Sequence, residues 1–243
     1  MAMKDKLFLY CEEALDLKNA KLSDEYYYSS LPLCILDAVY SIGVRYTATR
    51  NVVLRYCQKY NLPTSRNMSP EYPPGESQHT ISQLVENIEL VGAESFACHV
   101  LNNLQRTSTV SGILKSEAVY LWAKIFKEHD IEVFHDISTI GKEVENKILK
   151  IKGQRSGISL SYFYMLSGND NLCKPDRHIL RFLSKGLHRE IKDYSEAQAI
   201  MCDVTATLKE KYAHLSVRTL DHAIWVHMSN SDKEGKCLRR KKK

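Results

Sequence analysis

Apolar residues recur every three or four positions along most of this 243-residue chain, and this spacing restricts the fold more than any other feature. It places apolar side chains on one face of an α-helix, whereas the strict apolar–polar alternation typical of strands is rare. Examples are the stripes Leu114, Ala118, Leu121, Trp122 and Ile125; Val144, Ile148 and Ile151; Ala197, Ile200, Val204 and Leu208; and Leu220, Ile224 and Met228. With 44% hydrophobic residues, the chain can also bury a proper core. The sequence therefore predicts an all-α fold.

Proline and glycine positions suggest how the helices are grouped. A helix is expected over residues 4–17, and Pro32 opens an apolar helix that Gly43 ends, followed by a partner helix from about Thr47. Four of the six prolines lie between residues 63 and 75, which cannot be helical, and helix resumes over 81–104. We expect residues 1–62 and 185–232 to form one lobe, 63–80 a loop or linker, 81–184 a central lobe, and 233–243 a basic tail.

Cofactors and membranes are not expected. The seven cysteines are dispersed, with no CxxC pair and no Cys/His cluster, which argues against a disulfide framework, a zinc site and an iron–sulfur cluster. The longest apolar run, residues 31–44, is too short and too polar to cross a bilayer. The N-terminus does not read as a secretory signal. We therefore expect an intracellular protein, in the cytoplasm or the nucleus, with no metal or organic cofactor.

Positive charge is concentrated at the C-terminus. The last eleven residues, KEGKCLRRKKK, contain seven Lys or Arg and one Glu, and their net charge of +6 exceeds the +5 of the whole chain, so residues 1–232 carry about −1. The tail lacks an apolar period and is expected to be a mobile arm that adds sequence-independent attraction to nucleic acid. Binding of nucleic acid by the rest of the chain must depend on local geometry.

A short glycine-containing turn joins two expected helices within residues 146–166. One helix ends near Ile151, and the next begins at Ile158. The free backbone N–H groups at the start of the second helix lie beside the positive end of its dipole, an arrangement that binds phosphate. The candidate phosphate contacts are Lys152, Gly153, Gln154, Arg155, Ser156 and Gly157. A helix C-cap followed by an ordinary helix–helix turn also explains the two glycines.

This segment resembles the hairpin of the helix-hairpin-helix DNA glycosylase superfamily. The family hairpin reads Leu-Pro-Gly-Val-Gly, two further residues and Thr-Ala, and Ile151-Lys152-Gly153 matches its entry. The resemblance extends in order and spacing over roughly residues 30–230. LPLCILDAVYSIGVRYTATRNVVLRYC looks like the family's early helix pair, SGILKSEAVYLWAKIFKEHDI like its Gly-x-x-x-Lys-Ala helix, and LDHAIWVHM like a closing helix. It implies a two-lobed helical fold with a cleft between the lobes, without the iron–sulfur cluster.

The departures from the family pattern limit what the resemblance implies. Arg155 replaces the second glycine of the hairpin, Lys152 the proline and Ser159 the alanine. Bifunctional members carry a lysine that attacks the sugar, and the matching residue here is Gly157, which implies a monofunctional enzyme, with Lys152 and Lys174 as candidate substitute nucleophiles. The early helix pair also lacks the Gln-Gln-Thr of some members. The damaged or mismatched base therefore stays unassigned.

Asp176 lies where the family carries its catalytic carboxylate, about twenty residues beyond the hairpin and at the start of the next helix. The simpler interpretation is a helix N-cap, since Asp satisfies the free N–H groups there and contributes about 1 kcal/mol. The two interpretations are compatible, because N–H bonds and the helix dipole favour the anion. An anion beside the sugar stabilises an oxocarbenium-like transition state or activates a water.

Five further residues are candidates for the base pocket or for a wedge that fills the gap left by an extruded nucleotide. They are Gly43 and Arg45 at the turn of the early helix pair, Tyr162 as an aromatic wall, and Lys174 and His178 on either side of Asp176. Each also has an ordinary interpretation. By its spacing Tyr162 is a core residue, Arg45 is an exposed arginine in a turn, and a lone histidine is more often a surface or core residue.

The sequence thus predicts a monomeric protein that binds double-stranded DNA and hydrolyses the N-glycosidic bond of a damaged or mismatched base, with Asp176 supporting departure of the base. One alternative is a catalytically degenerate helix-hairpin-helix protein that binds DNA without excising a base. Another is a helical protein-interaction or RNA-binding module in which Asp176 is only a helix cap.

Overall fold

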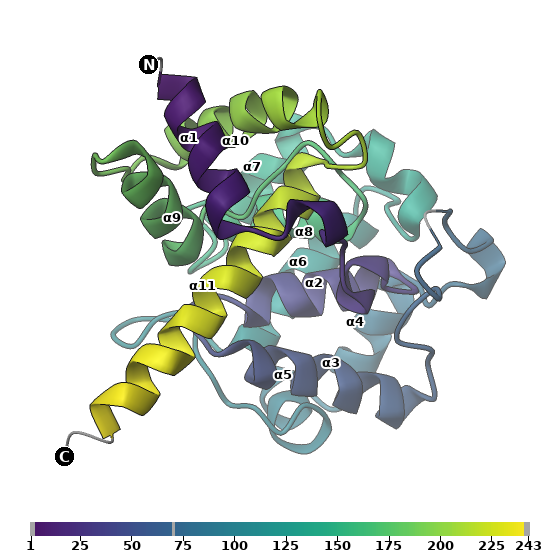
Figure 1. Ribbon diagram of the computed structural model, residues 1–243. Coiled ribbons are helices and arrows are strands. Elements are labelled where there is room, and N and C mark those ends of the chain that lie inside the picture. Colours follow the sequence, from purple (N-terminus) through teal and green to yellow (C-terminus); the bar gives the residue numbers. More distant parts are fainter. Residues whose placement is uncertain (1–2, 70, 241–243) are drawn as a thin grey trace. The chain divides into compact units, whose positions relative to one another are not determined.

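The computed structural model describes residues 3–69 and 71–240 (Figure 1). Within these residues the chain is mostly helical and has no strand, with isolated β-bridges at Tyr28–Ser65 and Arg106–Leu114. The expected all-α class is confirmed. The chain forms two compact units, a central unit of residues 23–168 and a terminal unit that combines residues up to 22 with those from 169 onward.

This division differs from the predicted lobes. Residues 23–62 belong to the central unit and residues 169–184 to the terminal unit, the reverse of the expectation. Prolines show where helices end, but they do not show which helices pack together. The proline-rich residues 63–80 are also no linker between the units, because they lie inside the central one. There the buried Arg66 donates to the carbonyl oxygen of Tyr28 at 2.7 Å, and its guanidinium lies 5.1 Å from the centre of the Phe134 ring.

The central unit is built around one helix that is buried on every side. All ten residues of α2 (Leu31–Tyr40) are buried, as its almost uninterrupted apolar sequence requires. It packs against α3 (Tyr46–Tyr60), α6 (Lys115–Lys127) and α8 (Ile158–Leu166). The other elements are η2 (Asp24–Tyr27), η3 (Gly75–Ser77), α4 (Ile81–Glu89), α5 (Ala93–Ser95), the π-helical turn η4 (Phe96–Val100), η5 (Phe134–Thr139) and α7 (Lys142–Lys150). The single helix expected over 81–104 is therefore divided, with the break after Glu89.

Lys115 fixes the C-terminal end of α2. Its side chain is buried, and its ammonium group donates to the carbonyl oxygens of Tyr40 at 3.0 Å and Ile42 at 2.8 Å. The last carbonyl groups of a helix have no partner within the helix, and buried ones cannot be satisfied by water. The lysine of α6 therefore sets where α2 ends and where the chain turns towards α3.

The terminal unit is a bundle of α1 (Met3–Ala14), α9 (Arg177–Leu187), α10 (Tyr194–Lys209) and α11 (Val217–Arg240), with the short η1 (Leu17–Asn19) (Figure 1). The buried core combines residues of all four α-helices, such as Leu7, Phe182, Met201 and Ile224. None of the helices in the described ranges is both long and apolar enough to cross a membrane.

The last helix is longer than the sequence predicts. The apolar stripe ends at Met228, and a mobile arm was expected over residues 233–243, yet α11 continues to Arg240. Once a packed helix has formed, good helix formers such as Lys, Arg and Leu extend it at little cost. Residues 241–243 of the predicted tail lie outside the described residues.

Replacing Lys115 by Met tests its role at the end of α2. Lys115→Met keeps the apolar stem but leaves two carbonyl groups without their charged donor, which we expect to lower the free energy of unfolding by about 1.5–3 kcal/mol. Urea denaturation followed by circular dichroism measures the change. The exposed Lys127 of the same helix provides the control Lys127→Met, and an equal loss in both variants would contradict the assigned role.

Candidate functional site

The predicted hairpin is present in the central unit. Helix α7 ends at Lys150, residues 151–157 form the turn, and α8 begins at Ile158. Two backbone bonds close the turn, from the Gln154 N–H to the Ile151 carbonyl oxygen at 2.9 Å and from the Gly157 N–H to the Gln154 carbonyl oxygen at 3.0 Å. Both glycines adopt positive φ angles, +92° at Gly153 and +73° at Gly157, which side chains rarely allow.

Gly153 also meets a steric limit. A Cβ atom added to it would lie 2.3 Å from the Cβ of Thr107, so the loop before α6 packs directly against the hairpin backbone. Gly157 is the N-cap of α8 and, having no side chain, leaves the first N–H groups of that helix without a side-chain cap. Both positions thus require a glycine for their positive φ angles. At Gly153 the close packing of Thr107 is a second reason.

The turn presents only part of the predicted phosphate-binding set. Lys152, Gly153, Arg155 and Ser156 are exposed, as a contact to a phosphate backbone requires. Gln154 is buried, and its amide oxygen accepts a hydrogen bond from the Ser159 hydroxyl. Its side chain therefore stabilises the turn from within, so a phosphate contact by Gln154 would have to use its backbone.

The turn of the early helix pair, between α2 and α3, is also solvent-exposed. Gly43 adopts a φ of +72°, and a Cβ atom there would meet nothing within 4 Å. Arg45 is exposed at the N-cap position of α3 and makes no side-chain cap bond. The predicted exposure of Arg45 is confirmed, and both interpretations of it, as a wedge or as an ordinary surface arginine, remain compatible with this position.

Tyr162 is a core residue. It is 6% exposed in α8, and burial followed by the charge of Asp37 raises the pKa of its hydroxyl well above the usual range. A buried ring offers no face on which an extruded base can stack. The structure thus supports the ordinary interpretation of Tyr162 as a core residue.

Asp176 caps α9 in the terminal unit, as the sequence predicts. Its Oδ1 atom accepts hydrogen bonds from the backbone N–H groups of His178 at 2.7 Å and Ile179 at 3.3 Å. Both bonds use the same oxygen, and among the described residues Oδ2 accepts no hydrogen bond. The side chain is partly exposed. The cap thus holds a carboxylate in one orientation and leaves one of its oxygens available to a ligand.

A second carboxyl group, Asp221, lies close to Asp176 and was not among the predicted site residues. It is 4% exposed in the first turns of α11, and its Oδ1 atom accepts the backbone N–H of Lys174 at 2.9 Å. Burial raises the pKa of Asp221 well above the usual range, and the negative charge of Asp176 adds to this effect. Asp221 therefore fixes the segment that leads to Asp176. A carboxylate beside Leu220 in an apolar stripe was the signal that could have revealed it.

The remaining candidates are placed as follows. His178 is buried within α9, which excludes a solvent-facing role for its ring in this structure. Lys174 is partly buried, and its backbone is the group bound by Asp221. Within the described residues, no group of three or more His, Cys, Asp or Glu side chains is arranged to hold a metal ion.

Comparison with known proteins gives one match. The family model described as "Domain of unknown function (DUF8548)" matches residues 5–229, a range that includes the hairpin, Asp176 and Asp221. No curated protein and no solved structure matches the chain.

Replacing Asp221 by Asn tests its protonation. A native pKa above the unfolded value means that the folded protein holds this proton more tightly, so its stabilising effect is complete below the ordinary aspartate pKa and is lost as pH rises through the native pKa. Asp221→Asn keeps an oxygen acceptor for the Lys174 N–H but does not titrate. We expect thermal melts from pH 4 to 8 to show the wild type losing stability relative to the variant as pH rises. A constant difference across this range would refute the assignment.

Proposed function

The chain belongs to this family of unknown function, and from its geometry we propose that it is a DNA-binding protein of the helix-hairpin-helix type that hydrolyses the N-glycosidic bond of an altered base. The observation that carries the proposal is Asp176. Its carboxylate is held by two backbone N–H groups at one oxygen, while the other oxygen has no partner among the described residues.

The hairpin supplies the contact to DNA. The exposed Lys152 and Arg155 flank a turn whose following helix has no side-chain cap, so its N–H groups and dipole favour an anion there. Such contacts hold a duplex without reading its sequence. This suits a protein that searches DNA for rare lesions rather than for one site.

The chemistry assigned to Asp176 balances without a cofactor. As the bond from C1′ of the sugar to the base nitrogen breaks, its electron pair leaves with the base and positive charge develops on the sugar. The carboxylate stabilises that charge and accepts a proton from the attacking water, whose oxygen bonds to C1′. The departing base takes up a proton, and the products are a free base and an abasic site.

One observation favours a second candidate function, which is DNA binding without excision. A flipped base is usually held by an aromatic wall, and Tyr162, the wall suggested by the sequence, is buried. A protein that retains the hairpin but lacks a pocket would bind DNA and leave the base in place. The experiment on Asp176 distinguishes the two functions.

We expect Asp176→Asn to abolish base excision while fold and DNA binding persist. Asn is nearly as good an N-cap as Asp, but it lacks the charge that offsets the developing positive charge, a loss of about a hundredfold or more in rate. The measurement is single-turnover excision from duplexes carrying deaminated, alkylated, oxidised or mismatched bases, with binding to an abasic analogue and a thermal melt.

Asp193→Asn is the matched control for this experiment. Asp193 caps α10 in the same unit, accepting the N–H of Glu196 at 2.7 Å, so the control makes the same chemical change at a second helix cap. It should excise at the wild-type rate. Wild-type excision by Asp176→Asn would show that Asp176 is only a cap, and binding without excision by the wild-type protein would favour the second candidate.

The product should be an intact abasic site. Gly157 occupies the position at which bifunctional relatives carry a lysine, so no amine is available there to form a Schiff base with the sugar. Treating the reaction with borohydride should trap no covalent protein–DNA adduct. If an adduct formed, this prediction would be wrong, and Lys152→Ala and Lys174→Ala would show which amine had reacted.

A further inference from the structure

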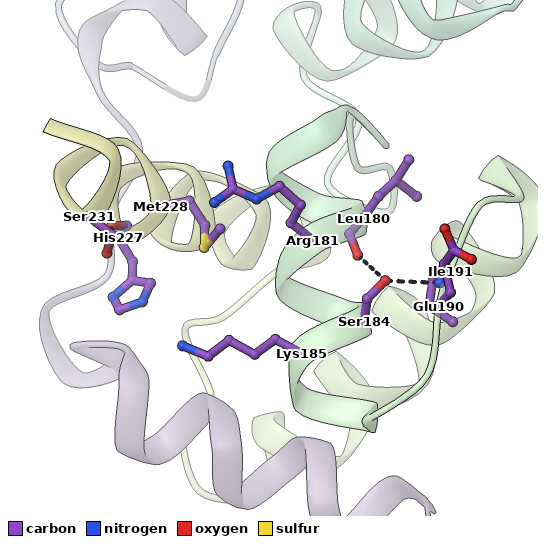
Figure 2. Close-up of a pocket in the computed structure, with 9 residues that line it drawn as sticks. All are labelled: Leu180, Arg181, Ser184, Lys185, Glu190, Ile191, His227, Met228 and Ser231. Carbon is purple, nitrogen blue, oxygen red and sulfur yellow. Dashed lines mark hydrogen bonds between the residues drawn. The ribbon is translucent and has the colours of Figure 1, made fainter. Parts of the chain in front are cut away.

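The terminal unit has a groove between α9 and α11 that the proposed chemistry does not use. Residues of α9, of α11 and of the segment after α9 line it: Leu180, Arg181, Ser184, Lys185, Glu190, Ile191, His227, Met228 and Ser231. Its volume of about 520 Å³ falls in the range of ligand sites rather than of packing defects. Figure 2 shows Arg181 and Lys185 extending from α9 towards α11, on the side where the ring of His227 lies.

Positive charge forms a row along α9, and two of its three members, Arg181 and Lys185, line the groove. Arg177, Arg181 and Lys185 are four residues apart and all exposed, so they follow one face of α9. Among the described residues of the lining, the one acidic residue is Glu190, and its pairing with Lys192 at 2.9 Å offsets its charge. The groove is therefore suited to an anionic ligand.

The row begins beside Asp176. This residue caps the N-terminus of α9, and Arg177 follows it directly, so the cations lead away from the carboxylate along the same helix. Four helical residues rise about 6 Å, close to two steps of roughly 3.4 Å, the advance per phosphate of one strand along the duplex axis. The spacing fits a phosphodiester chain better than a single small anion.

The walls of the groove are held in place by hydrogen bonds. The hydroxyl of Ser184 donates to the carbonyl oxygen of Leu180 at 2.7 Å and accepts the backbone N–H of Ile191 at 2.9 Å, which ties the segment after α9 to the helix (Figure 2). The other wall, α11, leads into the part of the sequence that holds seven Lys or Arg beyond Ser231. Positive charge in the sequence thus continues past the groove.

We propose that the groove between α9 and α11 is a second DNA-binding surface, in which Arg181 and Lys185 bind backbone phosphates of the strand whose sugar lies at Asp176. This inference rests on the proposed function, because it assigns the same duplex to a second surface. It adds that the terminal unit contributes to affinity, and that the hairpin is not the sole source of phosphate contacts.

The test is the salt dependence of binding to an undamaged duplex. Each phosphate contact adds about 0.9 to the slope of log affinity against log salt concentration. In the full-length chain, Arg181→Gln with Lys185→Gln should therefore lower the slope by about 1–2 and weaken binding by about tenfold or more at 0.1 M salt. Fluorescence anisotropy of a labelled duplex of about two helical turns measures both quantities.

Two further double variants make the result specific to the groove. Lys18→Gln with Lys209→Gln removes the same charge from exposed positions of the terminal unit outside the groove and should leave the slope unchanged. Arg181→Lys with Lys185→Arg retains the charge and should retain the slope. Since all these side chains are exposed, melting temperatures should stay near that of the wild type.

Two results would overturn the inference but not the proposed function: an unchanged slope for the glutamine variant of the groove, or an equal decrease in the Lys18 and Lys209 control. Failure of the wild-type protein to bind any duplex would overturn the proposed function, and the groove assignment with it.

Discussion

The ammonium group of Lys115 lies at the C-terminal end of a helix that has no exposed face. Because every residue of α2 is buried, the carbonyl groups at its end depend on a donor from elsewhere in the protein, and α6 supplies it. Within α2, the buried Asp37 accepts a hydrogen bond from the hydroxyl of Tyr28 at 2.8 Å. Apolar contacts are not directional, so these two buried contacts fix the register of α2 against its neighbours. They also determine where the exposed turn with Gly43 and Arg45 begins.

The shape of the hairpin also depends on contacts with residues outside the turn. Helix α8 packs on α2. In the turn that precedes α8, the hydroxyl of Ser159 is hydrogen-bonded to the side chain of Gln154. On the other side of the turn, Thr107 packs so closely that no side chain fits at Gly153. The exposed residues of the turn are therefore displayed on a rigid backbone. Pre-ordered N–H groups and cations bind an anion at a lower entropic cost than flexible ones.

Local patterns in the sequence predicted the helices and the caps, but not the partners of individual polar side chains. The apolar periods predicted α2 and α11, and the positions of Gly153, Gly157 and Asp176 predicted a turn and a cap, because each depends only on nearby residues. The burial of Gln154 could not be predicted, because the residue stands among exposed polar residues and its partner is Ser159, five positions away. Asp221 was missed because its partner, the Lys174 N–H, is 47 residues distant. The division into units failed for the same reason, since helical periods do not identify which faces meet.

The low net charge of residues 1–232 explains why any DNA binding by them must depend on local clusters of cations. Residues 1–232 have a net charge of about −1, so the field of the body as a whole does not attract a polyanion. Screening in physiological salt limits each surface charge to a range of about 8 Å, and clusters further apart act independently. Lys152 and Arg155 at the hairpin form one cluster, and Arg177, Arg181 and Lys185 on α9 form another. Asp176 accompanies the second cluster, so the carboxylate has cations on its own helix. In the function that we propose, these cations would offset the repulsion that Asp176 itself would exert on the phosphates of the substrate.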